Sequence, residues 1–346
     1  ILEDSANYSF NKSHSICYAA LAAITIYLKF KYPQEFFLAL LRMSRHEPDS
    51  INEISKIHKE MKNMGVELLP PHLIKSEMDF SIEEKNIRFG LLSIKGIADK
   101  SVEKLRQFQN KYSTKFQVFE AANKAGLGIG ILSALIQAGA FEGFKQSRTR
   151  VVYEAQVWSI LTPREKTLVH KRGKEFDYDL IKIIKHLYST PNEKGKLFIK
   201  ESRQNTIKNR TENFGKIYKQ NNKSTDFANW YYEKKLLGYT YGTTLKDLWR
   251  TKTDGLLSVQ DAQDSPLDSR IKFIGFVSDK PYRSQSKKGN DYLKIMVSDE
   301  RQEEKVMIFK GKMKQCVSQQ GGAPKEGEVV IVKGVKKDEV TFADII

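Results

Sequence analysis

Cysteine is scarce in this 346-residue sequence, where Cys17 and Cys316 stand far apart. Two such residues form neither a disulfide framework nor a zinc cluster, so the sequence predicts a reducing compartment. The six histidines are also scattered, without the spacing of paired metal ligands. We therefore expect no metal site in this chain.

Long apolar runs are missing as well. The best candidate is interrupted by Lys29 and Lys31, and it falls short of the roughly 18 to 20 apolar residues that a membrane span needs. The sequence opens with Ile1 and shows no secretory signal pattern. We expect a cytoplasmic protein without a membrane partner.

Positive charge is what the sequence has in excess. Its 58 Lys and Arg against 42 Asp and Glu give a net charge of +16 and a pI near 9.5. This field favours polyanionic partners, because each neutralised phosphate releases counterions. A merely soluble basic surface remains the alternative. The length exceeds one usual core and predicts about two to four domains.

The segment FNKSHS precedes a strongly apolar run over residues 14–31. Ser13 or Ser15 can cap a helix that begins there, and the helical spacing predicts one buried stripe. The positive end of this helix, with Lys12 and His14 beside it, would form a site for an anion such as a triphosphate or a nucleic-acid phosphate. We take Lys12, Ser13 and His14 as candidate nucleotide-binding residues.

The next segments also read as regular structure. Residues 34–43 predict a second helix after Pro33, and Asp49 or Ser50 can cap a third that ends at Gly65. Residues 79–82 and 86–91 predict a strand pair. The first part of the chain is therefore mostly helical, with a small sheet after it.

The text SIKGIADKSVEKL, from Ser93, has the shape of a hairpin between two helices. Small residues in such a hairpin let backbone amides approach a DNA phosphate closely. Asp99 is the expected cap of the following helix, and Gly126 and Gly139 are expected to end the next two. The candidate duplex-binding residues are Lys95, Gly96, Ile97, Ala98, Lys100 and Lys104.

Residues 164–223 carry sixteen Lys and Arg against seven Asp and Glu. The polar, turn-rich stretches STPNEKGK and KQNNKST predict that part of this segment is a flexible insertion. A solvated basic linker and a DNA-tracking surface are both open interpretations.

The last ~75 residues alternate between apolar and polar in short strand-like runs. Four or five such strands with the Lys-rich hairpin SQSKKGN fit an OB barrel, whose open face binds single strands by stacking and charge. At least one aromatic candidate is expected in the core. The candidate single-strand contacts are Tyr282, Arg283, Lys287, Lys288, Tyr292, Lys294 and Phe309.

Three segments together resemble one family. The first is FNKSHS with the helix and YLKFKYP that follow, the second is LLPPHLIKSEMDF with IRFGLLSIKGIADKSVEKL, and the third is YEKKLLGYTYGTTL from Tyr232. In this order they resemble the C-terminal portion of the bacterial or phage replicative DNA polymerase III alpha subunit, a C-family polymerase. The resemblance also sets an SH3-like barrel aside for the C-terminus. It implies a multidomain α+β protein: a helical fingers segment (1–75), a helix-hairpin-helix region (76–162), a basic insert and helical linker (163–265) and an OB domain (266–346).

Two departures from the family pattern are visible. The family hairpin usually carries Gly-x-Gly, whereas Ala98 takes the second position here. The family's clamp-binding peptide, of the kind Gln-x-x-Leu-Phe, has no good copy; KGKLF at residues 194–198 is nearest, so binding of a sliding clamp stays open.

The resemblance implies template-directed addition of deoxynucleotides (dNTP) to a primer on template DNA. The catalytic carboxylates that hold Mg²⁺ would lie upstream of FNKSHS, on a missing N-terminal region or a partner chain bearing the palm. Catalytic residues are therefore expected outside this chain, which alone would be inactive; Asp177 and Asp179 form an Asp-x-Asp at the wrong place. A non-catalytic DNA-binding accessory module is the alternative, and the expected location is the cytoplasmic nucleoid of a bacterium or a phage-infected cell.

Overall fold

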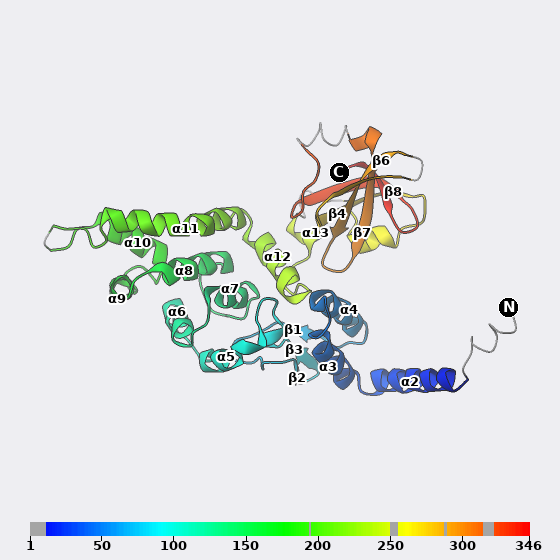
Figure 1. The fold of residues 1–346 in the computed structure, drawn as a ribbon, viewed down its shortest axis with the longest axis horizontal. Coiled ribbons are helices and arrows are strands. Elements are labelled where there is room, and N and C mark those ends of the chain that lie inside the picture. The colour runs from blue at the N-terminus through cyan, green and yellow to red at the C-terminus, as the bar shows by residue number, and fades with distance from the viewer. Residues whose placement is uncertain (1–11, 194, 250–254, 287–288, 314–321) are drawn as a thin grey trace. The chain divides into compact units, whose positions relative to one another are not determined.

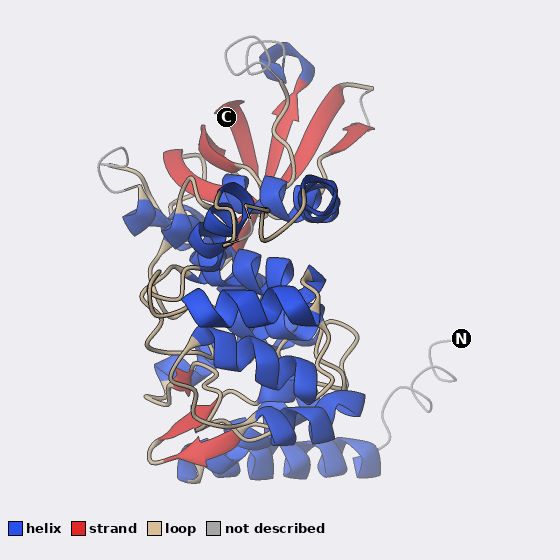
Figure 2. Ribbon diagram, turned by 90° about the vertical axis from the view of Figure 1, so that its left-hand side faces the viewer, coloured by secondary structure: helices blue, strands red, loops and turns tan. Residues whose placement is uncertain are grey.

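The computed structural model describes residues 12–193, 195–249, 255–286, 289–313 and 322–346 (Figure 1). It is an α+β structure with two sheets, shown red in Figure 2, and the expected fold class is confirmed at this level. The chain forms two compact units. The first holds the described residues up to Lys145 together with Lys166–Ile183, and the second holds Gln146–Glu165 and the described residues from Ile184 onward.

Three helices open the first unit: α2 (Lys12–Lys31), α3 (Pro33–Ser44) and α4 (Ser50–Asn63). Pro33 is the first residue of α3. A backbone N–H at that position has no hydrogen-bond partner inside the helix, so the helix loses no hydrogen bond because proline lacks this group. The Asp49 carboxylate caps α4 by accepting from Asn52 N at 3.3 Å, and Gly65 follows the helix at φ +70°. The expected cap and stop of this helix are confirmed.

Helix α2 corrects two expectations. It begins at Lys12, so Ser13 and Ser15 lie inside the helix. The expected buried stripe is wrong, because large apolar side chains are exposed all along it. They include Ile16, Tyr18, Leu21, Ile24, Ile26, Tyr27, Leu28 and Phe30. Helical spacing alone does not bury a face; a neighbouring element must cover it.

A small sheet and further helices complete the first unit. Its strands β1 (Leu68–Leu69), β2 (Ser81–Glu83) and β3 (Asn86–Arg88) lie in the order β1-β3-β2. Strands β2 and β3 form the expected pair, which is antiparallel. Phe80 and Phe89 are fully buried beside this sheet, with ring centroids 4.9 Å apart. The elements that follow are η1 (Leu91–Ser93), η2 (Asp99–Ser101), α5 (Val102–Phe108), α6 (Lys115–Lys124) and α7 (Ile129–Gln137).

The middle of the chain is helical. Its helices are α8 (Arg148–Ile160), α9 (Pro163–Arg172), α10 (Leu180–Ser189), α11 (Glu201–Asn221), α12 (Thr225–Leu237), α13 (Leu245–Leu248) and α14 (Val259–Gln263). Helix α11 packs along α8 (Figure 1). The Tyr153 and Tyr218 rings stack between these helices at 4.7 Å and 7°. Much of the basic segment is thus ordered helix, whereas its composition predicted a flexible insertion in part.

Six strands form the C-terminal sheet: β4 (Arg270–Val277), β5 (Tyr282–Gln285), β6 (Asp291–Ser298), β7 (Glu303–Phe309), β8 (Val329–Lys336) and β9 (Thr341–Ile345), in the order β4-β8-β9-β7-β6-β5. Strand β4 also pairs with β6, through Phe276 with Ser298 and Val277 with Val297. The backbones of β8 and β9 approach each other closely at Gly334, where a Cβ would lie 2.3 Å from the Phe342 carbonyl oxygen. Alternate residues of these strands fill one apolar core, including Phe273, Leu293, Ile295, Val306, Ile308 and Val332.

Candidate nucleic-acid interface

The expected hairpin forms an exposed loop between η1 and η2. Gly96 has φ +92°, a region that favours glycine, and a Cβ there would meet open space. Ile97 is 7% exposed and anchors the loop in the core, while Ala98 beside it is exposed. The backbone on either side of Ile97 is therefore open to an approaching phosphate.

Three lysines accompany this loop. Lys95, Lys100 and Lys104 are all exposed, as a role at a phosphate backbone requires. Asp99 was expected to cap the following helix, and this expectation is wrong. The residue before α5 is Ser101, which makes no side-chain cap bond, and the Asp99 carboxylate instead accepts from the Arg45 guanidinium.

A second loop of the same kind was missed from the sequence. Gly126 has φ +67°, Leu127 is 7% exposed, and Gly128 precedes α7 without a capping side chain. Like Gly96 and Ala98, Gly126 and Gly128 are exposed on either side of a buried residue. The available signal was Gly-Leu-Gly itself, which is the family's Gly-x-Gly pattern; Gly126 was interpreted only as a helix end.

Lys104 connects the two loops. Its Cε lies 3.7 Å from the position that a Cβ on Gly126 would occupy. Since Lys104 belongs to α5, which follows the first loop, one exposed ammonium stands beside the second loop. The two loops and this lysine come from separate stretches of sequence, and the fold of the first unit brings them together.

The candidate nucleotide site at the start of α2 is described only in part. Lys12, Ser13 and His14 are the first three residues of the helix, and its first turn has no acidic residue. The His14 ring is exposed and makes an edge contact with Tyr18 at 4.3 Å. The side chains of Lys12 and Ser13 lie outside the described part, so the anion-site role stays a prediction.

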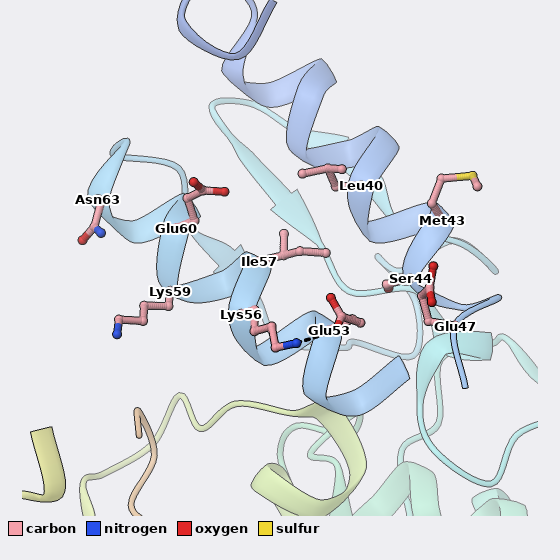
Figure 3. A pocket seen from close by; sticks show the side chains of 10 residues that line it. All are labelled: Leu40, Met43, Ser44, Glu47, Glu53, Lys56, Ile57, Lys59, Glu60 and Asn63. Carbon is pink, nitrogen blue, oxygen red and sulfur yellow. Dashed lines mark hydrogen bonds and ion pairs between the residues drawn. The ribbon is translucent and has the colours of Figure 1, made fainter. Parts of the chain in front are cut away.

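A groove of about 570 Å³ lies between α3 and α4 (Figure 3). Leu40, Met43 and Ile57 supply its apolar lining. Glu47, Glu53 and Glu60 also line it, and the Lys56 ammonium is held by Glu53 at 2.7 Å. Glu60 pairs with Lys29 in the last turn of α2, so the groove lies by the C-terminal end of that helix and not at its start, where the anion site is expected.

The C-terminal sheet gathers most of the predicted single-strand contacts on one face. Tyr282 pairs with Lys294, and Tyr292 pairs with Phe309. Their neighbours Leu293, Ile295 and Ile308 point into the core, so these four side chains share the opposite, outer face. Tyr282 is 62% exposed, whereas Tyr292 and Phe309 are half-buried. The expectation that one of the three aromatics is core is wrong, because strand alternation places all three on the same side.

Phe342 extends this outer face and was missed from the sequence. It pairs with Met307 across the parallel β7 and β9, and its ring contacts Phe309 at 5.2 Å. Tyr292, Phe309 and Phe342 thus form an aromatic row across three strands, which sequence distance conceals. Arg283 pairs with Leu293, so by register it lies on the other face of the sheet from this aromatic row. Lys287 and Lys288 lie outside the described residues.

The Asp-x-Asp of the basic segment has structural partners. Asp179 Oδ1 accepts from Lys182 N at 3.0 Å at the start of α10, and Asp177 pairs with Lys145 at 3.2 Å. These carboxylates are not directed at a shared ion. Across the described ranges, no group of three or more His, Cys, Asp or Glu is arranged to hold a metal.

A comparison with known protein families matches the segment that contains the two loops. Residues 65–151 match a family model described as a helix-hairpin-helix motif. This chain resembles DNA polymerase III alpha subunits. It is 36% identical over 155 residues to that of Aquifex aeolicus, an alignment that covers 44% of this chain and 13% of the relative. The resemblance expected from the three sequence segments is confirmed.

Other alpha subunits give the same result. Those of Halalkalibacterium halodurans and Deinococcus radiodurans are each 32% identical over 147 residues, which covers 42% of this chain and 13% and 11% of the relatives. The matched part is thus a small share of each alpha subunit. Among the described helices, none is both long and apolar enough to cross a membrane.

Proposed function

We propose that this chain acts in DNA replication as the DNA-binding part of a template-directed C-family DNA polymerase. The observation that carries the proposal is the pair of exposed loops at residues 96–98 and 126–128, inside the segment that matches the helix-hairpin-helix model. Each loop offers backbone amides to a phosphate, without a side chain in the way and independently of base sequence. Lys95, Lys100 and Lys104 add counter-charge.

The reaction itself is proposed to need a palm outside this chain, on a missing N-terminal region or a partner polypeptide. The exposed apolar length of α2 supports this, because a helix that is apolar on every side is normally buried. Asp177 and Asp179 do not fit a metal pair, since one pairs with Lys145 and the other caps α10. Mg²⁺ would therefore be held by palm carboxylates elsewhere.

Lys12, Ser13 and His14 are proposed to receive the triphosphate of the incoming nucleotide at the N-terminus of α2. A helix of 20 residues presents unpaired amides and a positive dipole end there. In the assembled enzyme, Lys12→Ala should impair nucleotide use more than primer-template binding. An unchanged KM and kcat for nucleotide would remove this role.

The C-terminal sheet is proposed to be an OB-type barrel whose outer face binds single-stranded template. The pairings run β4-β6-β7-β9-β8 and return to β4, which supports a closed arrangement. The aromatic row and Lys294 supply stacking and charge on that face. The same proposal includes the domain limits expected from the sequence, a location in the cytoplasmic nucleoid and any contact with a sliding clamp.

Primer extension tests the proposal. The purified chain should not extend a primer, and adding an alpha-subunit fragment that carries the palm should restore extension. Strong extension by the chain alone, unchanged by Asp177→Ala with Asp179→Ala, would show that the active site is misplaced here. Failure of the mixture to extend, with DNA binding intact, would favour the accessory-module alternative.

A further inference from the structure

A pocket of about 690 Å³ lies at the edge of the C-terminal sheet, around strands β5 and β6. Its lining includes Tyr282, Arg283, Gln285, Asp291, Tyr292 and Lys310. Strand β5 is the edge of the sheet and pairs with β6. By register, Arg283, Gln285 and Asp291 lie on the face opposite Tyr282 and Tyr292, and residues of both faces line the pocket at this edge. The cavity is large enough for a nucleotide, and its lining includes Tyr292 of the aromatic row.

Asp291 is the acceptor of this pocket. Its Oδ1 accepts from Gln285 Nε2 at 2.9 Å, and its Oδ2 pairs with Lys310 Nζ at 2.8 Å. These hydrogen bonds, from Lys310 first and then Gln285, lower the pKa of the Asp291 carboxyl, so it stays ionised at neutral pH. A carboxylate has about four acceptor positions. Two positions on Asp291 therefore remain for a ligand.

Arg283 is the available donor. Lys310 is neutralised by Asp291, whereas the Arg283 guanidinium makes no ion pair or hydrogen bond within the part of the chain that the structure describes. Its guanidinium presents two parallel N–H groups, the geometry that matches O6 and N7 of guanine. The pocket thus offers one donor fork and one ionised acceptor.

Guanine has the complementary edges. It presents O6 and N7 as acceptors, and N1–H and the N2 amino group as adjacent donors. In adenine, cytosine and thymine, each donor on the pairing edge has an acceptor beside it, which an ionised carboxylate repels. We propose that this pocket binds a guanine base, with Arg283 on O6 and N7 and Asp291 on N1–H and N2–H. The inference rests on the proposed single-strand role of the C-terminal sheet and adds base preference to it.

Two sources of guanine are tested separately with the full chain. Fluorescence anisotropy compares labelled hexathymidylate with hexamers that carry one guanine, adenine or cytosine at the third position. Ligand-observed NMR compares the four free deoxynucleoside monophosphates. We expect the guanine hexamer to bind roughly five- to tenfold more tightly than the others. This is the low end of the discrimination that a bidentate contact gives between bases, because Asp291 is partly exposed to water. A preference seen only for free dGMP would support the same guanine site with a mononucleotide as its source.

The decisive variant is Asp291→Asn, which replaces one acceptor oxygen with a donor and should abolish the guanine preference while hexathymidylate binding persists. Asp344→Asn is the matched control, because Asp344 is similarly exposed and pairs with Lys312 at 3.4 Å outside the pocket. Equal binding of all bases by the unaltered chain, or equal loss in both variants, would overturn the guanine site and leave the proposed single-strand function standing. Absence of binding to every hexamer would instead refute that proposed function.

Discussion

The Arg148 guanidinium donates to Glu233 Oε1 at 2.7 Å and joins the start of α8 to α12. Glu233 is only 2% exposed, and its other oxygen accepts from the backbone N–H groups of Tyr241 and Gly242, at 3.1 and 3.3 Å. Arg148 also donates to the Tyr241 hydroxyl at 2.9 Å. One buried carboxylate thus ties the end of α12 to the turn at Tyr241 and Gly242 within the segment YEKKLLGYTYGTTL.

Removing Arg148 should leave the Glu233 carboxylate buried without its counter-charge. We expect Arg148→Ala to destabilise the second unit by about 3 kcal/mol, the lower end for a broken buried pair because Arg148 is partly exposed. All three tryptophans, Trp158, Trp230 and Trp249, lie in this unit, so urea unfolding followed by tryptophan fluorescence reports on it. Lys216→Ala, which breaks the exposed pair with Glu212, should change stability by less than about 1 kcal/mol. Similar effects of the two variants would contradict this account.

Gly128→Val tests phosphate approach at the second loop without backbone strain. Gly128 has φ −65° and ψ 152°, which valine adopts readily, and a Cβ there meets open space. The fold should be unchanged, while the side chain blocks a phosphate and weakens duplex binding about tenfold, as expected for the loss of one charged hydrogen bond. Binding to primer-template in a filter or anisotropy assay measures this.

Gly322→Val is the control for that experiment, because a Cβ at Gly322 also meets open space, in the other unit. Gly96→Val should likewise weaken duplex binding with little dependence on base sequence, but it adds strain at φ +92°. Gly65→Val, at φ +70°, carries comparable strain outside the loops. Unchanged duplex affinity in both Gly96→Val and Gly128→Val would remove the two loops from the interface.

Tyr282→Ala tests stacking on the outer face of the C-terminal sheet. Since the ring is 62% exposed, its loss should hardly affect stability but should cost single-strand binding roughly 1 to 3 kcal/mol if a base stacks on it. Leu267→Ala, 61% exposed in the same unit, controls for loss of apolar surface. Lys287→Ala with Lys288→Ala should instead lower the salt slope of binding by up to about two. Equal loss of duplex and single-strand binding would show that the charge acts as one undivided surface.

Cys17 reports on whether α2 is covered in the complete enzyme. It is exposed on the apolar helix, so in a Cys316→Ser background its thiol should react with a maleimide at nearly the rate of a free peptide. Adding a palm-bearing fragment should slow the reaction strongly, because the proposed contact covers α2. Undiminished labelling in a mixture that extends primers would place the partner elsewhere.

The stability of the first unit should depend on pH through His58. Burial, with Lys62 nearby, lowers the pKa of His58 from 6.5 to about 4. The unfolded state therefore binds the proton more tightly, so this stability is fully present above about pH 6.5 and is lost as pH falls towards 4. At pH 5 the loss is about 2 kcal/mol, from roughly 1.4 kcal/mol per pKa unit.

Hydrogen exchange of the α4 amides at pH 7.5 and pH 5 measures this local stability once intrinsic exchange rates are corrected. His58→Leu should reduce the difference between the two pH values. His46→Leu is the control, because His46 is exposed in the turn that follows α3. An equal reduction in the two variants would contradict a specific role for His58.

Local chemistry made several elements readable from the sequence alone. Asp49 accepts from a first-turn amide, Gly65 adopts a positive φ that ends α4, and Gly96 turns the first loop. Each depends on a few neighbouring residues. The period-two runs after residue 270 indicated strands for the same reason, because alternation follows from the pleat of a single strand.

Tertiary structure decided which of these elements meet. Strand register put Tyr292, Phe309 and Phe342 in one row, although Phe342 lies 33 residues from Phe309 in sequence. Packing of the first unit set Lys104 beside Gly126. Burial also depends on what covers a surface, so the apolar spacing of α2 determined its helix but not a buried face. Short-range bonding fixes a residue's conformation, whereas long-range packing fixes its neighbours, and the candidate sites consist of neighbours.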